Sequence, residues 1–207
     1  MDNHLQNKPQ HNTAFVLGNG KSRLRLKLDE LKFHASVYGC NALYREYTPD
    51  YLIAVGEKMV REIEKTGYHL KNTVWTNPNK GVLKISGLNY FKPHKGWSSG
   101  PTALWLAAKN NHETIYIFGF DYEGIDRKVN NVYADTANYK KSTDIATYYG
   151  NWLHQTEQVI RDNKHIKFVR VIDTLNFRPP TLNQITTNFE HISYDEFEKK
   201  FPGIVIK

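Results

Sequence analysis

Short apolar runs alternate along the chain with segments whose apolar residues recur at helical spacing. We expect strands at the apolar runs, over residues 14–17, 35–38, 51–55, 74–75, 114–118 and 167–171. Because helical segments separate many of these runs, the pattern predicts an α/β fold with a mostly parallel sheet.

Four segments are predicted to be helical from apolar stripes and capping residues. Residues 57–65 place Met59, Val60 and Ile63 on one face and are followed by Gly67, a common helix stop. The other helices are expected from residues 98–101 onward, from a cap at Ser142 or Thr143 to residue 160, and over residues 193–201.

The polar segments divide the chain into a tail, a domain and loops. Residues 1–12 contain no apolar run, so we expect a flexible tail there and a single domain over residues 13–207. Two stretches are candidates for function, since long loops tend to carry it. One is a lid-like loop at about residues 122–141, and the other is residues 77–97, either a long loop or a small hairpin.

Composition excludes several classes of protein. With 40% hydrophobic and 24% charged residues, the 207-residue chain can build a core. No apolar run approaches the length of a membrane-spanning helix, and the polar N-terminus lacks a signal-peptide core. The lone cysteine, Cys40, excludes an intramolecular disulfide and a cysteine-rich zinc site. We expect a cytoplasmic protein that does not bind membranes and can form a homo-oligomer.

The net charge of +7 is concentrated in one part of the chain. No acidic residue occurs between Glu64 and Glu113. This stretch holds seven lysines and several aromatic residues: Lys65, Lys71, Lys80, Lys84, Lys92, Lys95 and Lys109, with Tyr68, Trp75, Tyr90, Phe91 and Trp97. Such a segment suits an anionic partner, a nucleotide or a nucleic acid. The alternative is an ordinary basic surface whose aromatic residues belong to the core.

A glycine turn, Gly18-Asn19-Gly20, follows the first apolar run. It is not a phosphate-binding P-loop, because Phe15 stands where that motif needs glycine. Nor is it the dinucleotide fingerprint, because Arg23 replaces the third small residue. What remains is a turn at the carboxyl end of a strand, whose backbone N–H groups can hold a phosphate. The alternative is a plain turn.

Polar residues also follow two other strands. Asn41 comes after the second strand and is either a phosphate or base ligand or a turn residue. Asp121 and Glu123 follow residues 114–118 and are either paired carboxylates for a divalent cation or, as we favour, groups that order the loop or a ribose hydroxyl. The nine histidines form no i, i+4 pair, which argues against a zinc site.

Five short motifs occur in order: FVLGNGKS, YGCNALY, SSGPTALWLAA, IYIFGFD and YADT. Over about residues 14–172, this order resembles the bacterial sialyltransferases of glycosyltransferase family 42. It is also similar to related motility-associated glycosyltransferases and archaeal hydroxymethylpterin pyrophosphokinases. Small stand-alone members of this group resemble phage proteins, which would place the chain in a host cytoplasm.

The resemblance implies a Rossmann-like nucleotide-sugar-binding domain, with helices on both faces of the sheet and a lid. It implies donor binding by Asn19 and Asn41, a nucleotide near Ser99 and Gly100, and no essential metal. The full set of expected donor-binding residues is Gly18, Asn19, Gly20, Asn41, Lys95, Ser99 and Gly100. The expected catalytic residues are Asp121, Glu123 and Tyr133, the last as a lid tyrosine that binds phosphate.

Three departures from the family pattern concern catalysis. Residues 134–144 lack the general-base histidine of the sialyltransferase lid. An expected arginine is replaced by the neighbourhood of Lys95, and Glu123 stands where a second lid tyrosine is expected. Asp121 or Glu123 is therefore the expected base.

The resulting hypothesis is a transferase that moves a group from a nucleotide-activated sugar to an acceptor hydroxyl. The basic segment extends this hypothesis to a modified base in DNA as the acceptor. The alternatives are a pyrophosphokinase-like phosphoryl transferase, which would need a metal, and a non-catalytic nucleotide- or DNA-binding protein.

Overall fold

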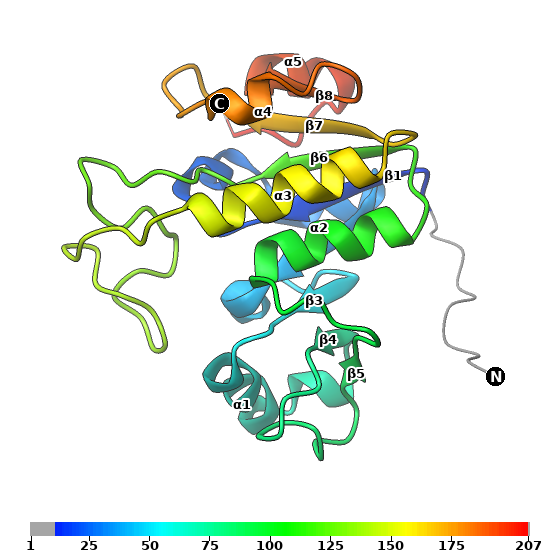
Figure 1. The fold of residues 1–207 in the computed structure, drawn as a ribbon, viewed down its shortest axis with the longest axis vertical. Coiled ribbons are helices and arrows are strands. Elements are labelled where there is room, and N and C mark those ends of the chain that lie inside the picture. Colours follow the sequence, from blue (N-terminus) through cyan, green and yellow to red (C-terminus); the bar gives the residue numbers. More distant parts are fainter. Residues whose placement is uncertain (1–10, 207) are drawn as a thin grey trace.

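The computed structural model describes residues 11–206, and its centre is a single eight-stranded parallel sheet (Figure 1). The strands are β1 (Thr13–Leu17), β2 (Ser36–Cys40), β3 (Tyr51–Ile53), β4 (Val74–Thr76), β5 (Asn89–Tyr90), β6 (Thr114–Phe118), β7 (Lys167–Ile172) and β8 (Phe189–Ser193). Their order across the sheet is β5-β4-β3-β2-β1-β6-β7-β8, and all neighbours are parallel. The predicted α/β, Rossmann-like class is confirmed.

Helices cover both faces of the sheet. They are α1 (Glu57–Thr66), α2 (Ser99–Lys109), α3 (Gly150–Asp162), α4 (Pro180–Asn183) and α5 (Tyr194–Lys200), with 3-10 turns η1 (Lys21–Arg25), η2 (Leu28–Phe33), η3 (Asn41–Arg45) and η4 (Tyr68–Leu70). Side chains of β1 alternate between the faces. Ala14 and Val16 join a core with α2, α3 and α4, whereas Phe15 and Leu17 join a core with α1 and α5.

The strand order places three strand ends side by side. The chain steps outward from β1 to β5, and α2 then carries it back to β6 on the other side of β1. Leu17 is paired with both Gly39 and Phe118, so β1, β2 and β6 end at one level. Open α/β sheets bind ligands at the carboxyl ends of their strands where the order reverses in this way.

Helix α3 begins later than its sequence pattern predicts. It starts at Gly150 rather than just after Ser142 or Thr143. Residues 144–146 instead form backbone hydrogen bonds with residues 127–129, so they cannot turn into a helix. A pairing partner distant along the chain therefore decides where this helix starts.

Two loops also differ from expectation. The connection between β6 and α3, called the lid below, includes residues 122–149 rather than 122–141 alone. Residues 77–97 form no hairpin, because their strand β5 lies parallel to β4. The sequence pattern had not predicted β5, β8 or α4, which are short or irregular in their hydrophobic spacing.

The predicted tail, residues 1–12, lies outside the described residues except for its last two. His11 and Asn12 accept hydrogen bonds on their carbonyl oxygens, His11 from the ring of His112 and Asn12 from the backbone N–H of Glu113. These two residues of the predicted tail therefore contact the segment that leads into β6. Within residues 11–206, none of the helices combines the length and the apolar character that crossing a membrane requires.

Candidate functional site

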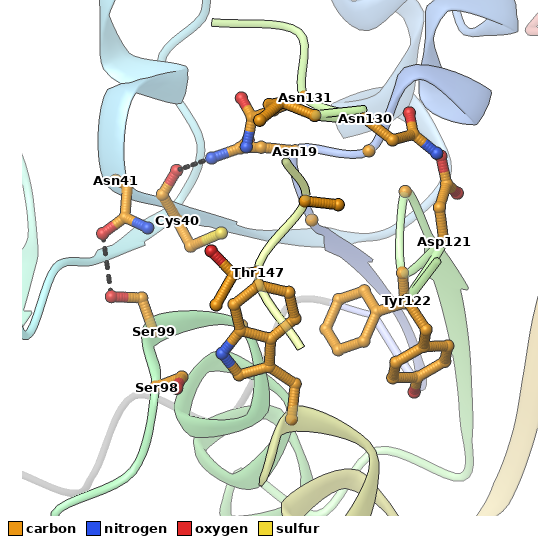
Figure 2. Close-up of a pocket in the computed structure, with 18 of the residues that line it drawn as sticks. Asn19, Cys40, Asn41, Ser98, Ser99, Asp121, Tyr122, Asn130, Asn131 and Thr147 are labelled. Atoms are coloured by element: carbon orange, nitrogen blue, oxygen red, sulfur yellow. Dashed lines mark hydrogen bonds between the residues drawn. The ribbon is translucent and has the colours of Figure 1, made fainter. Parts of the chain in front are cut away.

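A pocket of about 370 Å³ opens at the carboxyl ends of β1, β2 and β6. Its walls come from the turns after these strands, from the N-terminus of α2 and from the lid (Figure 2). Eight of the ten site residues predicted from the sequence line it: Gly18, Asn19, Gly20, Asn41, Ser99, Gly100, Asp121 and Glu123. Their roles in binding and catalysis stay predictions.

Close backbone contacts join the turns after β1 and β6 at the pocket. The N–H of Gly18 donates to Phe118 O at 2.8 Å, and that of Gly20 donates to Gly119 O at 2.9 Å. A Cβ atom on Gly18 would lie 2.5 Å from Gly119 O, so no side chain fits there. Gly119 also has a φ of 65°, which favours glycine. The glycines are therefore required by close backbone contact, whatever the ligand.

Two asparagine side chains frame the pocket (Figure 2). Asn19 is buried and donates from Nδ2 to Cys40 O at 3.2 Å. Asn41 adopts a left-handed φ of 53°, and its Oδ1 accepts the hydroxyl of Ser99 at 2.8 Å. Its Nδ2 has no hydrogen-bond partner within residues 11–206 and faces the pocket, where it can donate to a ligand.

The N-terminus of α2 opens onto the same side of the pocket. Ser98, Ser99, Gly100 and Pro101 line it, and the first turn of the helix carries no acidic residue. The hydroxyl of Ser99 is already engaged, since it also accepts the backbone N–H of Val55 at 3.1 Å. The unpaired backbone N–H groups of a helix N-terminus favour an anion such as a phosphate.

Asp121 organises the strand-end turns. It is buried, and its carboxylate accepts the backbone N–H of Ser22 at 3.0 Å, the Ser22 hydroxyl, and Asn130 Nδ2 at 3.1 Å. Glu123, two residues later, is exposed on the pocket wall, and its carboxylate has no partner among the described residues. Of these two predicted bases, Glu123 has the free carboxylate.

Tyr133 and Lys95 do not line the pocket. The hydroxyl of the buried Tyr133 donates to Glu46 Oε1 and accepts Arg23 Nη2 at 2.7 Å. Burial raises the pKa of Tyr133 above its usual value. Lys95 is exposed, with its Nζ 5.1 Å from the ring centre of Trp97. The Tyr133 hydroxyl therefore joins the lid to Arg23 and Glu46 outside the pocket lining, and its role as a phosphate ligand stays a prediction.

Sequence reasoning missed several lid residues that line the pocket, among them Tyr139 and Lys140. The Tyr139 hydroxyl accepts Asn19 Nδ2 at 3.4 Å and the backbone N–H of Ala42 at 3.3 Å. Burial raises its pKa to about 12, so at neutral pH the hydroxyl keeps a proton that it can donate into the pocket. A second tyrosine after the YADT motif was the available signal.

The pocket's cysteine has no features of a nucleophile. Cys40 is buried, and its Sγ donates to Leu17 O at 3.4 Å. Burial raises the pKa of its thiol to about 12, so the reactive thiolate is disfavoured. No group of three or more His, Cys, Asp or Glu within residues 11–206 is placed to hold a metal ion.

The basic segment has exposed lysines, whereas its aromatic residues are buried or half-buried. All seven lysines are exposed, and none forms an ion pair within residues 11–206. The aromatic side chains between them belong to or pack against the two cores: Tyr68, Trp75, Tyr90, Phe91 and Trp97. The segment therefore offers charge to a partner without an exposed row of aromatic rings.

A solved structure with a similar fold is the monofunctional alpha-2,3-sialyltransferase Cst-I from Campylobacter jejuni. The similarity covers 91% of this chain and 84% of that one, with a TM-score of 0.59 and 14% sequence identity. At this identity it establishes the fold alone, and it confirms the sialyltransferase-like fold expected from the motifs. No family model matches the chain, and no curated protein matches it either.

Proposed function

We propose that this chain is a glycosyltransferase that binds a nucleotide-activated sugar in the strand-end pocket. One observation carries the proposal. The N-terminus of α2 and the unpaired Nδ2 of Asn41 line the same pocket, at the point where the strand order reverses. A solved sialyltransferase with a similar fold supports the same class of donor.

In this proposal the donor phosphate lies between α2 and the lid. The helix N-terminus and Asn41 Nδ2 donate to it from one side, and Tyr139 and Lys140 from the other. These groups would stabilise the charge that grows on the phosphate as it leaves.

Glu123 is the proposed general base. The acceptor oxygen bonds to the anomeric carbon while the bond from that carbon to the phosphate oxygen breaks. The acceptor proton passes to the Glu123 carboxylate, and the electron pair of the broken bond stays on the phosphate. Asp121 is not the better base, because Ser22 and Asn130 already occupy its carboxylate.

The same observation weighs against the phosphoryl-transferase alternative. That reaction would use carboxylates such as Asp121 to hold a divalent metal, whereas the Asp121 carboxylate is hydrogen-bonded to Ser22 and Asn130.

The exposed lysines support an anionic acceptor such as DNA. Reversing the charge of Lys84, Lys92 and Lys95 should therefore flatten the salt dependence of DNA affinity.

A thermal-shift panel of nucleoside monophosphates, nucleoside diphosphates and their sugar derivatives tests the proposal. At least one ligand should raise the melting temperature of the parent by mass action. With the sugar donor so found, Glu123→Gln should keep the thermal shift and lose turnover. Asp126→Asn, which neutralises an exposed lid acid outside the pocket lining, should keep both. The absence of any shift across the panel would refute the proposed function.

A further inference from the structure

Arg45 joins the lid to helix α1 at a point outside the pocket. Arg45, the last residue of η3, donates to both carboxylate oxygens of Glu62 on α1, from Nε and Nη2, at 2.7 Å each. The same guanidinium donates to the lid, from Nη1 to Thr136 Oγ1 at 2.8 Å and from Nη2 to Ala137 O at 2.9 Å. Arg45 therefore bridges α1 and the lid.

Glu62 completes the bridge from the other side. Its carboxylate also accepts the Tyr44 hydroxyl and Asn138 Nδ2, each at 2.6 Å. Burial alone would raise the pKa of Glu62, but the bonds from Tyr44, Arg45 and Asn138 outweigh it and lower the pKa. The Arg45 and Glu62 side chains are only 24% and 21% exposed, so solvent screens this bidentate pair less than an ordinary surface pair. We call Arg45 and Glu62 the lid clamp.

The clamp is hydrogen-bonded to the lid immediately before Tyr139, which lines the pocket. Thr136, Ala137 and Asn138 lead directly into Tyr139, whose ring centre lies 5.9 Å from the Arg45 guanidinium. The Tyr139 hydroxyl in turn reaches Asn19 inside the pocket. A continuous chain of contacts thus runs from α1 through the clamp to the pocket wall.

The lid has a second attachment six residues before Tyr139, where the Tyr133 hydroxyl is bonded to Arg23 and Glu46. Between it and Tyr139 the lid turns sharply, with left-handed φ values of 68° at Asp135 and 66° at Asn138. Backbone hydrogen bonds link the two tyrosines through Thr136, whose N–H donates to Tyr133 O at 3.2 Å and whose O accepts the N–H of Tyr139 at 3.1 Å. The clamp adds side-chain hydrogen bonds to residues 136–138, directly before Tyr139, and so fixes the part of the turn that the Tyr133 hydroxyl does not touch.

We propose that Arg45 and Glu62 are positioning residues that hold Tyr139 against Asn19 and so preform the lid wall of the donor pocket. This inference rests on the proposed function for its ligand, a nucleotide. Preforming the wall spares the ligand the cost of ordering the lid, so the clamp should raise nucleotide affinity although neither residue lines the pocket.

Hydrogen exchange of the ligand-free protein is the first test. Arg45→Met should increase deuterium uptake over residues 133–139, and Arg45→Lys should do the same, since lysine keeps the charge but lacks the planar fork. The matched control is Arg61→Met, which removes an arginine paired with Glu64 on α1 but not bonded to the lid. Unchanged uptake in both Arg45 variants would overturn the inference, whatever the protein binds.

A double-mutant cycle is the second test, using the nucleotide with the largest thermal shift on the parent. Arg45→Met should weaken its binding roughly tenfold. In a Tyr139→Phe background the same change should have little further effect, because the group it positions is gone. Additive losses would mean that Arg45 does not act through Tyr139 and would overturn the inference. If no nucleotide binds the parent, the proposed function fails, and hydrogen exchange alone decides the clamp.

Discussion

The pocket has two walls that are held by different forces. The strand-end wall, made by the turns after β1, β2 and β6, is fixed by backbone hydrogen bonds and by glycines with no room for a side chain. The lid wall is fixed by side chains from distant segments, through Asp121, Arg23 with Glu46, and Arg45 with Glu62. The first wall should respond to steric change and the second to loss of charge.

The largest effect is expected for Gly18→Ala. Its Cβ would meet the Gly119 carbonyl at 2.5 Å, and backbone cannot move aside as a flexible side chain can. We expect a loss of about 1–3 kcal/mol in the free energy of unfolding, measured with denaturant. Gly56→Ala, where nothing lies within 4 Å, is the control and should cost less than about 1 kcal/mol. Equal losses in the free energy of unfolding for the two variants would show that the strand-end wall can shift to make room for a methyl group.

Asn41→Ala should come next, mainly through ligand binding. Removing its amide should weaken nucleotide binding by about 1–3 kcal/mol in calorimetry, the range for a hydrogen bond to a charged group. Asn19→Ala should weaken binding similarly. Both changes should also lower stability, because Asn19 is bonded to Cys40 O and Asn41 to the Ser99 hydroxyl. The control is Asn151→Ala, an exposed asparagine of α3 outside the pocket lining. Unchanged affinity in the Asn19/Asn41 double variant would mean that the site lies elsewhere.

Tyr133→Phe, a change in the lid wall, should lower the free energy of unfolding by about 1 kcal/mol, the usual contribution of one buried hydrogen bond. Arg23 and Glu46 remain bonded to each other at 2.7 Å, which limits the loss. Because the hydroxyl lies outside the pocket lining, nucleotide affinity should fall less than in Tyr139→Phe. Tyr148→Phe, at a side chain that is 79% exposed, is the control for stability. A larger loss of affinity for Tyr133→Phe would place its hydroxyl at the ligand.

The smallest effect is expected from acid pH. Burial alone would raise the pKa values of Glu46 and Glu62, but hydrogen bonds from Arg23 and Tyr133, and from Tyr44, Arg45 and Asn138, lower them. A lowered pKa contributes stability above the unfolded value of about 4.3 and loses it as the pH falls through the folded value. The loss per group should be below about 1 kcal/mol, since both carboxylates are partly exposed.

Amide resonances of residues 133–139, followed by NMR between pH 7 and pH 3, measure this effect. They should shift before those of the strand-end turns, and Glu62→Gln should remove part of the change. Simultaneous transitions in both walls would show that the lid is not separately sensitive to charge.

Local patterns predicted the parts of this protein that local chemistry controls. The apolar runs marked β1, β2, β3, β4, β6 and β7 within a few residues, and the cap at Ser193 marked α5, where its hydroxyl accepts the N–H of Glu196 at 3.1 Å. Position along the chain also predicted that residues after strand ends, such as Asn19, Asn41 and Asp121, lie close together. The carboxyl ends of neighbouring parallel strands must meet at one edge of the sheet.

Only the tertiary structure decided which lid tyrosine faces the pocket, which acid is free and where α3 begins. Each of these depends on a partner outside the local sequence: Tyr139 on Asn19, Asp121 on Ser22, and residues 144–146 on residues 127–129. Hydrophobic spacing reports which face of an element is buried, but it does not record what a polar side chain meets across a loop. That is why the strand-end wall could be predicted from the sequence, whereas the lid wall had to be seen in three dimensions.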